Sequence, residues 1–227
     1  MFKLSCHLSE DNLITIYISK FFLVQPLRLI MKAALILAGG KAARFCGEKK
    51  AFITLKGKPL LQWVIEAVYP CVDEIFLSGD EDLKQFGYPV VQDKFVDLGP
   101  IAGFHSGFSL IKSEYTFVTG CDMPFIKPDV IKHLFEKARG YSCCLPREGD
   151  FFEPLCCVYR TEEVKSCCDT IIEKGKRKIL TLIHCLSDPR YISYEEIRRI
   201  DPHLVSFKNI NTYEDLQEIT LKRERIL

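Results

Sequence analysis

The segment from Leu37 to Lys50, L-A-G-G-K-A-A-R-F-C-G-E-K-K, carries the residue types that bind phosphate groups. Gly39 and Gly40 allow the backbone to turn sharply and to approach a ligand without a Cβ clash. Backbone N–H groups in such a loop form a concavity for anions, to which Arg44 and Lys50 add positive charge. The segment is neither G-x-x-x-x-G-K-[ST] nor G-x-G-x-x-G, so a P-loop ATPase or a dinucleotide dehydrogenase is a weak fit. The pattern predicts a triphosphate site, the alternative being a tight turn with two solvated basic residues.

Two aspartates and a pair of glycines follow other apolar runs. Asp122 comes after the run that ends at Thr119, and Mg²⁺ prefers one or two carboxylates together with phosphate oxygens and waters. Asp122 is therefore a candidate metal ligand, although an aspartate that caps a turn is equally compatible with the residues. Asp93 could reach a ribose hydroxyl or a second Mg²⁺ position, or cap a turn. Gly99 and Gly103 would let the backbone lie close to a base or ribose, or form a plain junction between a loop and a helix.

Three segments of the last third carry polar groups whose role the residues leave open. Glu153-Pro154-Leu155 precedes an apolar run. In Asn209-Ile210-Asn211-Thr212, the two asparagines could donate hydrogen bonds to a second substrate or shape a turn, and Thr212 is a fair helix N-cap. The basic run from Lys174 to Lys178 is typical of a solvated face, and could also meet an anionic second substrate.

Apolar runs and helical patterns alternate from residue 32 onward, and this alternation must position the candidate site. The predicted strands are Ala33–Leu37, Glu74–Leu77, Val90–Val91, Tyr115–Thr119, Cys143–Leu145 and Leu155–Tyr159. Predicted helices begin at Pro59, Pro100, Pro128 and Thr161, and one more follows Thr212. Such alternation predicts a mostly parallel sheet with helices on both faces, in which ligands bind at the carboxyl ends of the strands.

Composition narrows the class of protein. The 227 residues fit one sizeable domain without a dividing linker, and the net charge of +1 argues against a broad nucleic-acid footprint. The eleven cysteines include three adjacent pairs, but there is no C-x-x-C and no zinc-like spacing. We interpret them as small buried residues of a protein in a reducing cytoplasm, in preference to a metal or disulfide framework.

The first thirty residues stand apart from this pattern. They lack the uninterrupted apolar run of a membrane span and the cleavage site of a signal peptide. Met31 lies directly before the first predicted buried strand. We therefore expect residues 1–30 to be a non-native or poorly ordered extension, and residues 31–227 to form a single domain.

Taken together, the motifs resemble the molybdenum cofactor guanylyltransferases, within the wider group of glycine-rich-loop nucleotidyltransferases. The resemblance spans roughly residues 32 to 220, and its opening loop and Cys121-Asp122-Met123-Pro124 mark the wider group. Its E-P-L and N-I-N-T segments narrow the resemblance toward the molybdenum cofactor branch. The other matching segments are Lys41, Gly57-Lys58-Pro59-Leu60, Asp93 and Gly99-Pro100-Ile101-Ala102-Gly103.

The resemblance implies a doubly wound, Rossmann-like α/β fold and the transfer of GMP from GTP to Mo-molybdopterin, with release of pyrophosphate. Arg44, Lys50 and Asp122 are expected to act in catalysis, and Asp122 to hold Mg²⁺. The residues expected to bind the nucleotide are Leu37, Ala38, Gly39, Gly40, Lys50, Asp93 and Asp122. Together with the composition, these features predict a cytoplasmic enzyme with no nucleic-acid or membrane partner. A monomer, and transient contact with molybdoenzymes or their chaperones, are compatible with it.

The chain departs from the family pattern at three places. Arg44-Phe45-Cys46 stands where R-M-G is usual, Lys49 stands where an acidic residue is common with Glu48 one place earlier, and Tyr213 replaces the usual proline. These differences bear on the exact loop geometry and, to a lesser degree, on the choice of nucleotide, but they leave the phosphate-binding residues in place. The alternatives are a related transferase that uses CTP or another small phosphorylated acceptor, and a non-catalytic nucleotide-binding protein.

Overall fold

A computed structural model describes residues 5–8, 13–17, 27–28, 31–39, 47–95 and 98–221 of the chain. Its contacts divide the chain into two units, Met1–Met31 and Lys32–Leu227. In the first unit, strands β1 (Ser5–Leu8), β2 (Leu13–Tyr17) and β3 (Leu27–Arg28) form an antiparallel sheet. Gly40, Lys41 and Arg44 lie outside the described residues.

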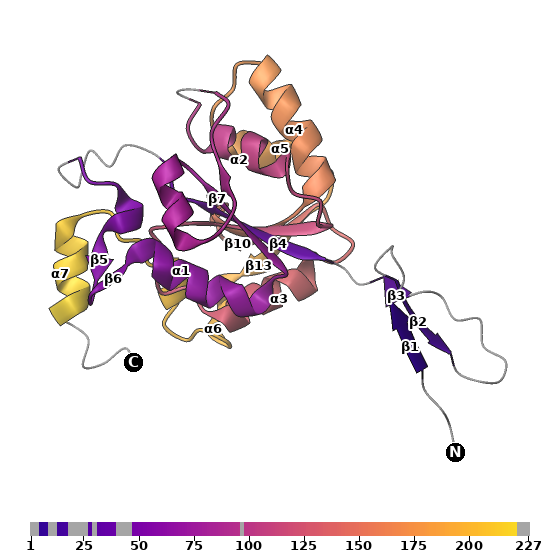
Figure 1. Cartoon of the computed structure of the whole chain (residues 1–227), viewed down its shortest axis with the longest axis horizontal. Helices are drawn as coiled ribbons and strands as arrows, with labels where there is room; N and C mark the ends of the chain where they lie inside the picture. Colours follow the sequence, from indigo (N-terminus) through magenta and orange to yellow (C-terminus); the bar gives the residue numbers. More distant parts are fainter. Residues whose placement is uncertain are drawn as a thin grey trace. The chain divides into compact units, whose positions relative to one another are not determined.

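The second unit is built around one mixed, mostly parallel sheet (Figure 1). Its strand order is β11-β10-β12-β9-β4-β7-β8, and β13 pairs with β10. The strands are β4 (Lys32–Leu37), β7 (Glu74–Ser78), β8 (Val90–Val91), β9 (Tyr115–Gly120), β10 (Cys143–Glu148), β11 (Phe151–Phe152), β12 (Cys156–Arg160) and β13 (Pro189–Ser193). Strands β9, β4, β7 and β8 are mutually parallel, whereas β12 runs antiparallel to both of its neighbours, β9 and β10.

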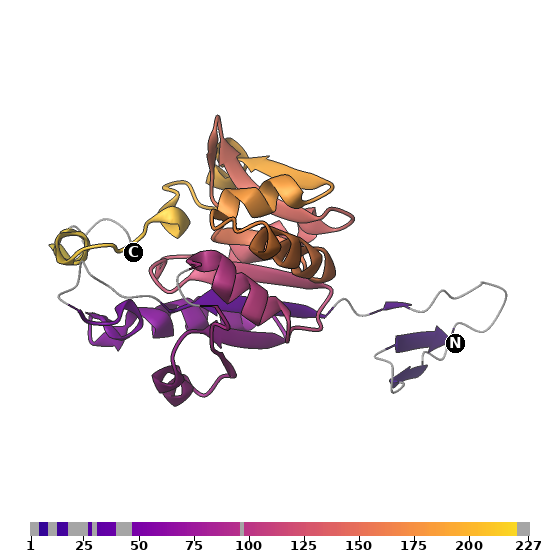
Figure 2. The same cartoon turned by 90° about the horizontal axis from the view of Figure 1, so that it is seen from above.

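Helices cover both faces of this sheet, as Figures 1 and 2 show. The helices are α1 (Leu60–Val68), α2 (Pro100–Phe108), α3 (Pro128–Ala138), α4 (Thr161–Glu173), α5 (Ile179–Cys185), α6 (Tyr194–Arg198) and α7 (Tyr213–Leu221). Helices α2, α4 and α5 pack together on one face, and α1, α3 and α6 lie on the other. The predicted α/β class, a mostly parallel sheet with helices on both faces, is confirmed.

The first strand of the sheet shows why the sequence folds in this way. Residues Ala33 to Ile36 are 0% exposed because helices cover both faces, so an unbroken apolar run is needed. On one face, the ring of Tyr159 packs edge-on against Phe104 and Phe108 at centroid distances of 5.4 and 6.2 Å. Helix α3 begins with Pro128 at its first position and ends before Gly140, whose φ of +85° suits a helix stop.

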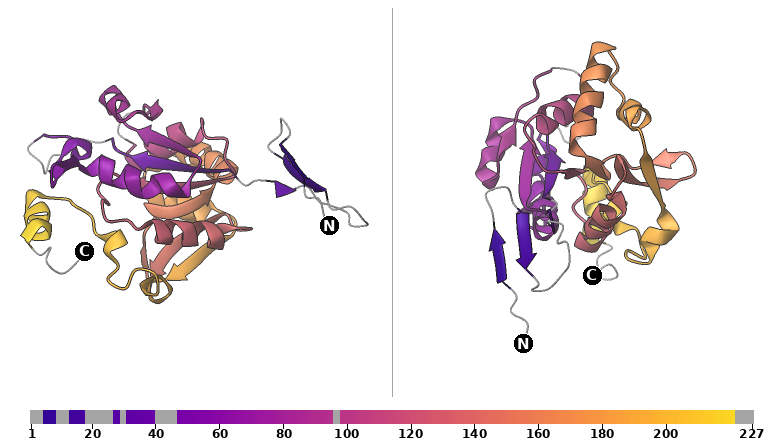
Figure 3. Two further views of the ribbon diagram at one scale, coloured as in Figure 1. Left: turned by 60° about the horizontal axis from the view of Figure 1, so that its bottom comes forward. Right: turned by 90° about the vertical axis from the view of Figure 1, so that its right-hand side faces the viewer.

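The C-terminal helix packs on a separate small cluster. Strands β5 (Thr54–Leu55) and β6 (Lys58–Pro59) pair as a hairpin, and α7 lies beside it (Figure 3, left). Leu216 and Ile219 of α7 pack against the small hydrophobic cluster to which Leu55 of this hairpin belongs. Pro59 was predicted to be the first residue of a helix. In the structure it ends β6 and lies directly before α1, which begins at Leu60. Helix α7 begins after Thr212, whose Oγ1 accepts a hydrogen bond from Asp215 N at 3.1 Å, as expected for an N-cap. Among the described residues, no helix is long and apolar enough to cross a membrane.

Candidate nucleotide site

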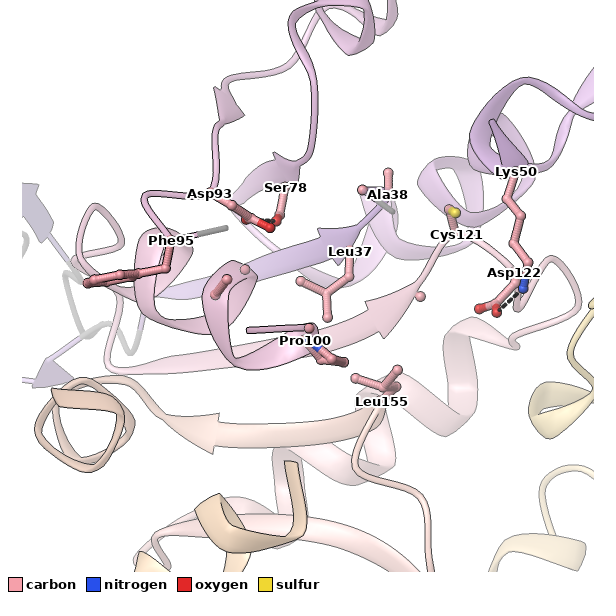
Figure 4. Close-up of a pocket in the computed structure, with 15 residues that line it drawn as sticks. Leu37, Ala38, Lys50, Ser78, Asp93, Phe95, Pro100, Cys121, Asp122 and Leu155 are labelled. Carbon is pink, nitrogen blue, oxygen red and sulfur yellow. Dashed lines mark hydrogen bonds and ion pairs between the residues drawn. The ribbon is translucent and has the colours of Figure 1, made fainter. Parts of the chain in front are cut away.

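A cavity of about 600 Å³ lies at the carboxyl ends of the central parallel strands (Figure 4). It receives Leu37 from the end of β4, Ser78 from the end of β7, Asp93 from the segment after β8, and Gly120 from the end of β9. The full lining is Leu37, Ala38, Gly39, Lys50, Ser78, Asp93, Phe95, Gly99, Pro100, Ala102, Gly103, Gly120, Cys121, Asp122 and Leu155. The expected place of the site, just after these strands, agrees with the position of the cavity.

The backbone at the strand ends is tightly fixed. Ala38 N donates to Ser78 O at 2.8 Å, and Cys121 N donates to Leu37 O at 3.0 Å, so the ladder continues beyond β4. A Cβ at position 39 would lie 3.3 Å from the Cα of Gly79, which explains why the turn uses a glycine. The start of the glycine-rich segment is therefore held directly against the turn that follows β7.

One end of the cavity carries a cation and a carboxylate. The Lys50 Nζ lies 3.0 Å from Asp122 Oδ2 and donates to Asn211 Oδ1 at 2.7 Å. The side chains of Lys50 and Asp122 are 24% and 23% exposed, so both can still be reached from the cavity. Figure 4 shows the lysine extending toward the aspartate from the short helix η2 (Lys50–Phe52).

The other end of the cavity carries a second carboxylate. Ser78 Oγ donates to Asp93 Oδ1 at 3.2 Å, and Figure 4 shows the two side chains facing each other. Burial raises the pKa of the Asp93 carboxyl; the Ser78 hydrogen bond opposes this rise, and the negative charge of Asp80 adds to it. A Cβ at Gly103 would lie 2.7 Å from Ser78 Oγ, so the glycine makes room for the serine. Ser78 was not among the predicted site residues, because a lone serine at a strand end carries no distinctive signal.

A third acidic group lies two residues before Leu155, close enough to feel the charge of Asp122. Glu153 is half-buried and precedes Leu155, which lines the cavity. Burial raises the pKa of Glu153 to about 7, the backbone N–H of Leu155 opposes this rise, and the charge of Asp122 adds to it. The sequence placed Glu153 in a family motif but assigned it no role, since its burial depends on residues far along the chain.

Two neighbouring groups are poorly suited, by their surroundings, to phosphate binding and to nucleophilic chemistry respectively. Lys49 Nζ forms ion pairs with Asp80 and Asp82 at 2.7 and 2.6 Å and does not line the cavity. Cys121 lines the cavity, but burial, followed by the nearby Asp122 charge, raises its thiol pKa to about 12. The thiol is therefore neutral near pH 7 and is a poor nucleophile.

The structure brings most of the predicted site residues around this one cavity. Those that line it are Leu37, Ala38, Gly39, Lys50, Asp93 and Asp122. Gly40 and Arg44, for which binding and catalytic roles were also predicted, lie outside the described residues. The predicted interpretation of the cysteines fits the thiols the structure describes, all of which are free and all of which except Cys185 are buried.

This arrangement can bind a ligand that is anionic at one end and carries hydroxyl or amide donors at the other. A cavity of this volume falls in the range of small-molecule sites. Backbone groups of the first turn lie between the lysine–aspartate pair and the carboxylate of Asp93, which suits a triphosphate joined to a nucleoside. The fold and this site define the nucleotidyltransferase class of α/β enzymes.

Comparison with known proteins narrows this class to one family. A family model described as "MobA-like NTP transferase domain" matches residues 34–188. The chain belongs to this family and is a nucleotidyltransferase.

Two curated relatives and one solved structure are similar over most of their length. A protein of Methanosarcina mazei named "Probable molybdenum cofactor guanylyltransferase" is 34% identical, over 83% of this chain and 89% of the relative. The "Molybdenum cofactor guanylyltransferase" of Desulfosudis oleivorans is also 34% identical, over 85% of this chain and 96% of the relative. The structure of "Molybdopterin-guanine dinucleotide biosynthesis protein A" from Archaeoglobus fulgidus superposes with a TM-score of 0.70 and 33% identity, covering 83% of this chain and 96% of that one.

Proposed function

We propose that this enzyme transfers GMP from GTP to Mo-molybdopterin, forming the guanine dinucleotide form of the cofactor and releasing pyrophosphate. The observation that carries this proposal is the Lys50–Asp122 pair, at 3.0 Å, at one end of a nucleotide-sized cavity in a MobA-like domain. The names of the relatives from Methanosarcina mazei and Desulfosudis oleivorans support the choice of guanine and of the molybdenum cofactor.

We place GTP in the cavity in one direction. The triphosphate is placed against Lys50, where the ammonium can exchange its Asp122 contact for phosphate oxygens. The ribose is placed near Asp93, whose carboxylate can accept hydrogen bonds from its hydroxyls. The backbone from Leu37 to Gly39 lies between these two ends, close enough for direct contact because Gly39 carries no side chain.

Asp122 fits the role of a magnesium ligand. It is a cavity-lining carboxylate at a strand end, and the described residues contain no cluster of three or more His, Cys, Asp or Glu that could enclose a metal ion. A single carboxylate supplemented by phosphate oxygens and waters is the coordination that Mg²⁺ accepts in nucleotide enzymes. When bound at Asp122, the ion would supply charge neutralisation to the phosphates.

The chemistry then requires positioning more than proton transfer. An oxygen of the acceptor phosphate forms a bond to the α-phosphorus of GTP, and the bond from this phosphorus to the bridging oxygen of pyrophosphate breaks. The acceptor phosphate is already ionised near pH 7, so no side chain has to act as a strong general base. Lys50 offsets the negative charge that develops on the leaving pyrophosphate. Arg44 is assigned the same role on the basis of the sequence alone.

The proposed enzyme acts in the cytoplasm on two small-molecule substrates. The free, mostly buried thiols of the described residues support a reducing compartment. We propose a monomer that makes transient contact with molybdoenzymes or their chaperones, and binds neither nucleic acid nor membrane.

A coupled pyrophosphate assay tests this proposal. The full-length protein is incubated with Mg²⁺ and Mo-molybdopterin, and with either GTP or CTP. Pyrophosphate release that needs both GTP and the acceptor is the expected result. Pyrophosphate release with CTP and the acceptor, but not with GTP, would establish a cytidylyltransferase instead. Tight GTP binding without pyrophosphate release would establish a non-catalytic binding protein.

A further inference from the structure

The start of α7 and the turn before it contact η2 and the segment that leads into η2 at two points. The Lys50 Nζ donates to Asn211 Oδ1 at 2.7 Å, across 161 residues of sequence. The Tyr213 hydroxyl donates to Glu48 Oε2 at 3.0 Å, across 165 residues. Both contacts connect the phosphate side of the cavity to the last part of the domain.

The turn itself is firmly anchored. Ile210 is 0% exposed, and its N–H donates to the carbonyl of Asp122 at 2.8 Å. The carboxylate of Asp215 accepts from Asn211 N and Thr212 N at 2.7 and 2.9 Å. The backbone of Asn211 is thus held in place relative to Asp122.

We propose that Asn211 and Tyr213 form a latch that positions Lys50 for phosphate, with Asn211 holding the ammonium and Tyr213 holding the preceding residues through Glu48. The inference rests on the proposed nucleotidyl transfer. A lysine side chain has four flexible bonds, and a fixed second oxygen beside Asp122 removes part of the entropy cost of aiming it. Asn211 is therefore a positioning residue for the nucleotide side, and its side-chain oxygen does not bind the acceptor.

The role of Asn211 is tested by nucleotide affinity in the absence of any acceptor. Asn211→Ala removes a hydrogen bond to a charged group and is expected to weaken GTP binding about tenfold. Asn209→Ala is the matched control, because Asn209 is exposed and belongs to the same motif, and it should leave GTP affinity unchanged. Unchanged GTP affinity in Asn211→Ala, with a raised KM for the acceptor alone, would place Asn211 in the acceptor site and overturn the inference.

The role of the Tyr213–Glu48 contact is tested by a double-mutant cycle. Tyr213→Phe and Glu48→Ala are each expected to weaken GTP binding about threefold, and the double variant no more than either one. Glu48→Gln retains an acceptor oxygen and should keep near-normal affinity, whereas a merely structural loss would lower the active fraction without changing affinity. Tyr69→Phe, at a tyrosine that is 67% exposed, is the control for loss of a hydroxyl. Wild-type affinity in Tyr213→Phe, or multiplied losses in the double variant, would overturn the latch.

Binding of inorganic triphosphate separates this inference from the proposed function. The latch acts on Lys50, so the Asn211 variant and the variants of the Tyr213–Glu48 contact should lose affinity for inorganic triphosphate by the same factor as for GTP. This result would support the latch even if the wild-type protein released no pyrophosphate with GTP and Mo-molybdopterin. A wild-type protein that binds neither GTP nor inorganic triphosphate, or variants that lose affinity for GTP alone, would overturn it.

Discussion

The ammonium of Lys50 lies 3.0 Å from the carboxylate of Asp122, so the expected phosphate ligand and the expected magnesium ligand face each other across 72 residues of sequence. Each group is about a quarter exposed and neutralises the other. Binding of a triphosphate with its metal ion replaces one ion pair with two sets of charged contacts. Substitution of either residue therefore leaves the charge of the other without its partner.

We expect Lys50→Ala to weaken GTP binding far more than Lys49→Ala. Loss of a charge-assisted contact to phosphate costs about 1.5–3 kcal/mol, whereas exposed ion pairs such as those of Lys49 with Asp80 and Asp82 contribute about 0–1 kcal/mol. Isothermal titration with GTP measures both variants. Equal losses at the two lysines would show that the phosphate lies along a different part of the segment.

Asp122→Asn is expected to be chiefly a catalytic defect. Asparagine keeps the shape and an oxygen toward Lys50 but removes the charge that attracts Mg²⁺, so transfer should fall by orders of magnitude while GTP still binds. The measurements are GTP affinity with and without Mg²⁺ and the rate of pyrophosphate release. Near-normal turnover at ordinary Mg²⁺ would contradict the assignment and point to Asp93 as the metal ligand.

Glu153→Gln is expected to remove a pH dependence of stability. Burial raises the pKa of Glu153 to about 7, so the protonated form is favoured in the folded state. The protonated carboxyl therefore adds up to about 3 kcal/mol to the free energy of unfolding. This contribution is complete below the ordinary glutamate pKa and is lost as the pH rises through 7.

Urea unfolding of wild type and Glu153→Gln at pH 5 and pH 8 measures this contribution. The stability difference between the two proteins should change across the interval, with the wild type losing more as the pH rises. The exposed Glu148 provides the control Glu148→Gln, which should follow the wild type. If the curve for Glu153→Gln also runs parallel to that of the wild type, Glu153 is not buried as described.

Gly103→Ala is expected to disturb the nucleoside end of the cavity. The added methyl would lie 2.7 Å from Ser78 Oγ and 3.0 Å from Leu37 Cδ2, so Ser78 must shift away from Asp93. Overpacking of this kind costs about 1–3 kcal/mol of stability, and we expect weaker GTP binding as well. Adding Ser78→Ala should restore part of the stability. If the second substitution restores none, the methyl is accommodated elsewhere.

A chain that starts at Met31 is expected to fold and to keep its GTP affinity. The motivation is that Met31 directly precedes β4 and that contacts divide the chain between Met31 and Lys32. Urea unfolding and GTP titration of the shortened and full-length proteins provide the comparison. A loss of several kcal/mol, a large part of the stability of a typical domain, would show that residues 1–30 stabilise the domain.

Much of the fold and part of the site could be predicted from the sequence because the signals are local. The unbroken apolar run before Leu37 and the helical spacing after Pro128 each reflect burial of one element, which periodicity records directly. The same holds for Asp122, since a carboxylate that leaves a buried parallel strand must emerge at the ligand-binding edge. The family resemblance added the expected chemistry to residues that the pattern had already placed there.

Other features depend on which elements become neighbours, and this only the tertiary structure decided. No local pattern distinguishes the antiparallel β12 from a parallel strand, because a strand buried on both faces is uniformly apolar in either direction. Ser78 joins the site only because Gly103 of another element leaves room for its hydroxyl. The contact between Lys50 and Asn211 spans 161 residues, and hydrogen bonding between residues so far apart follows from packing of the whole sheet and not from the sequence around either residue.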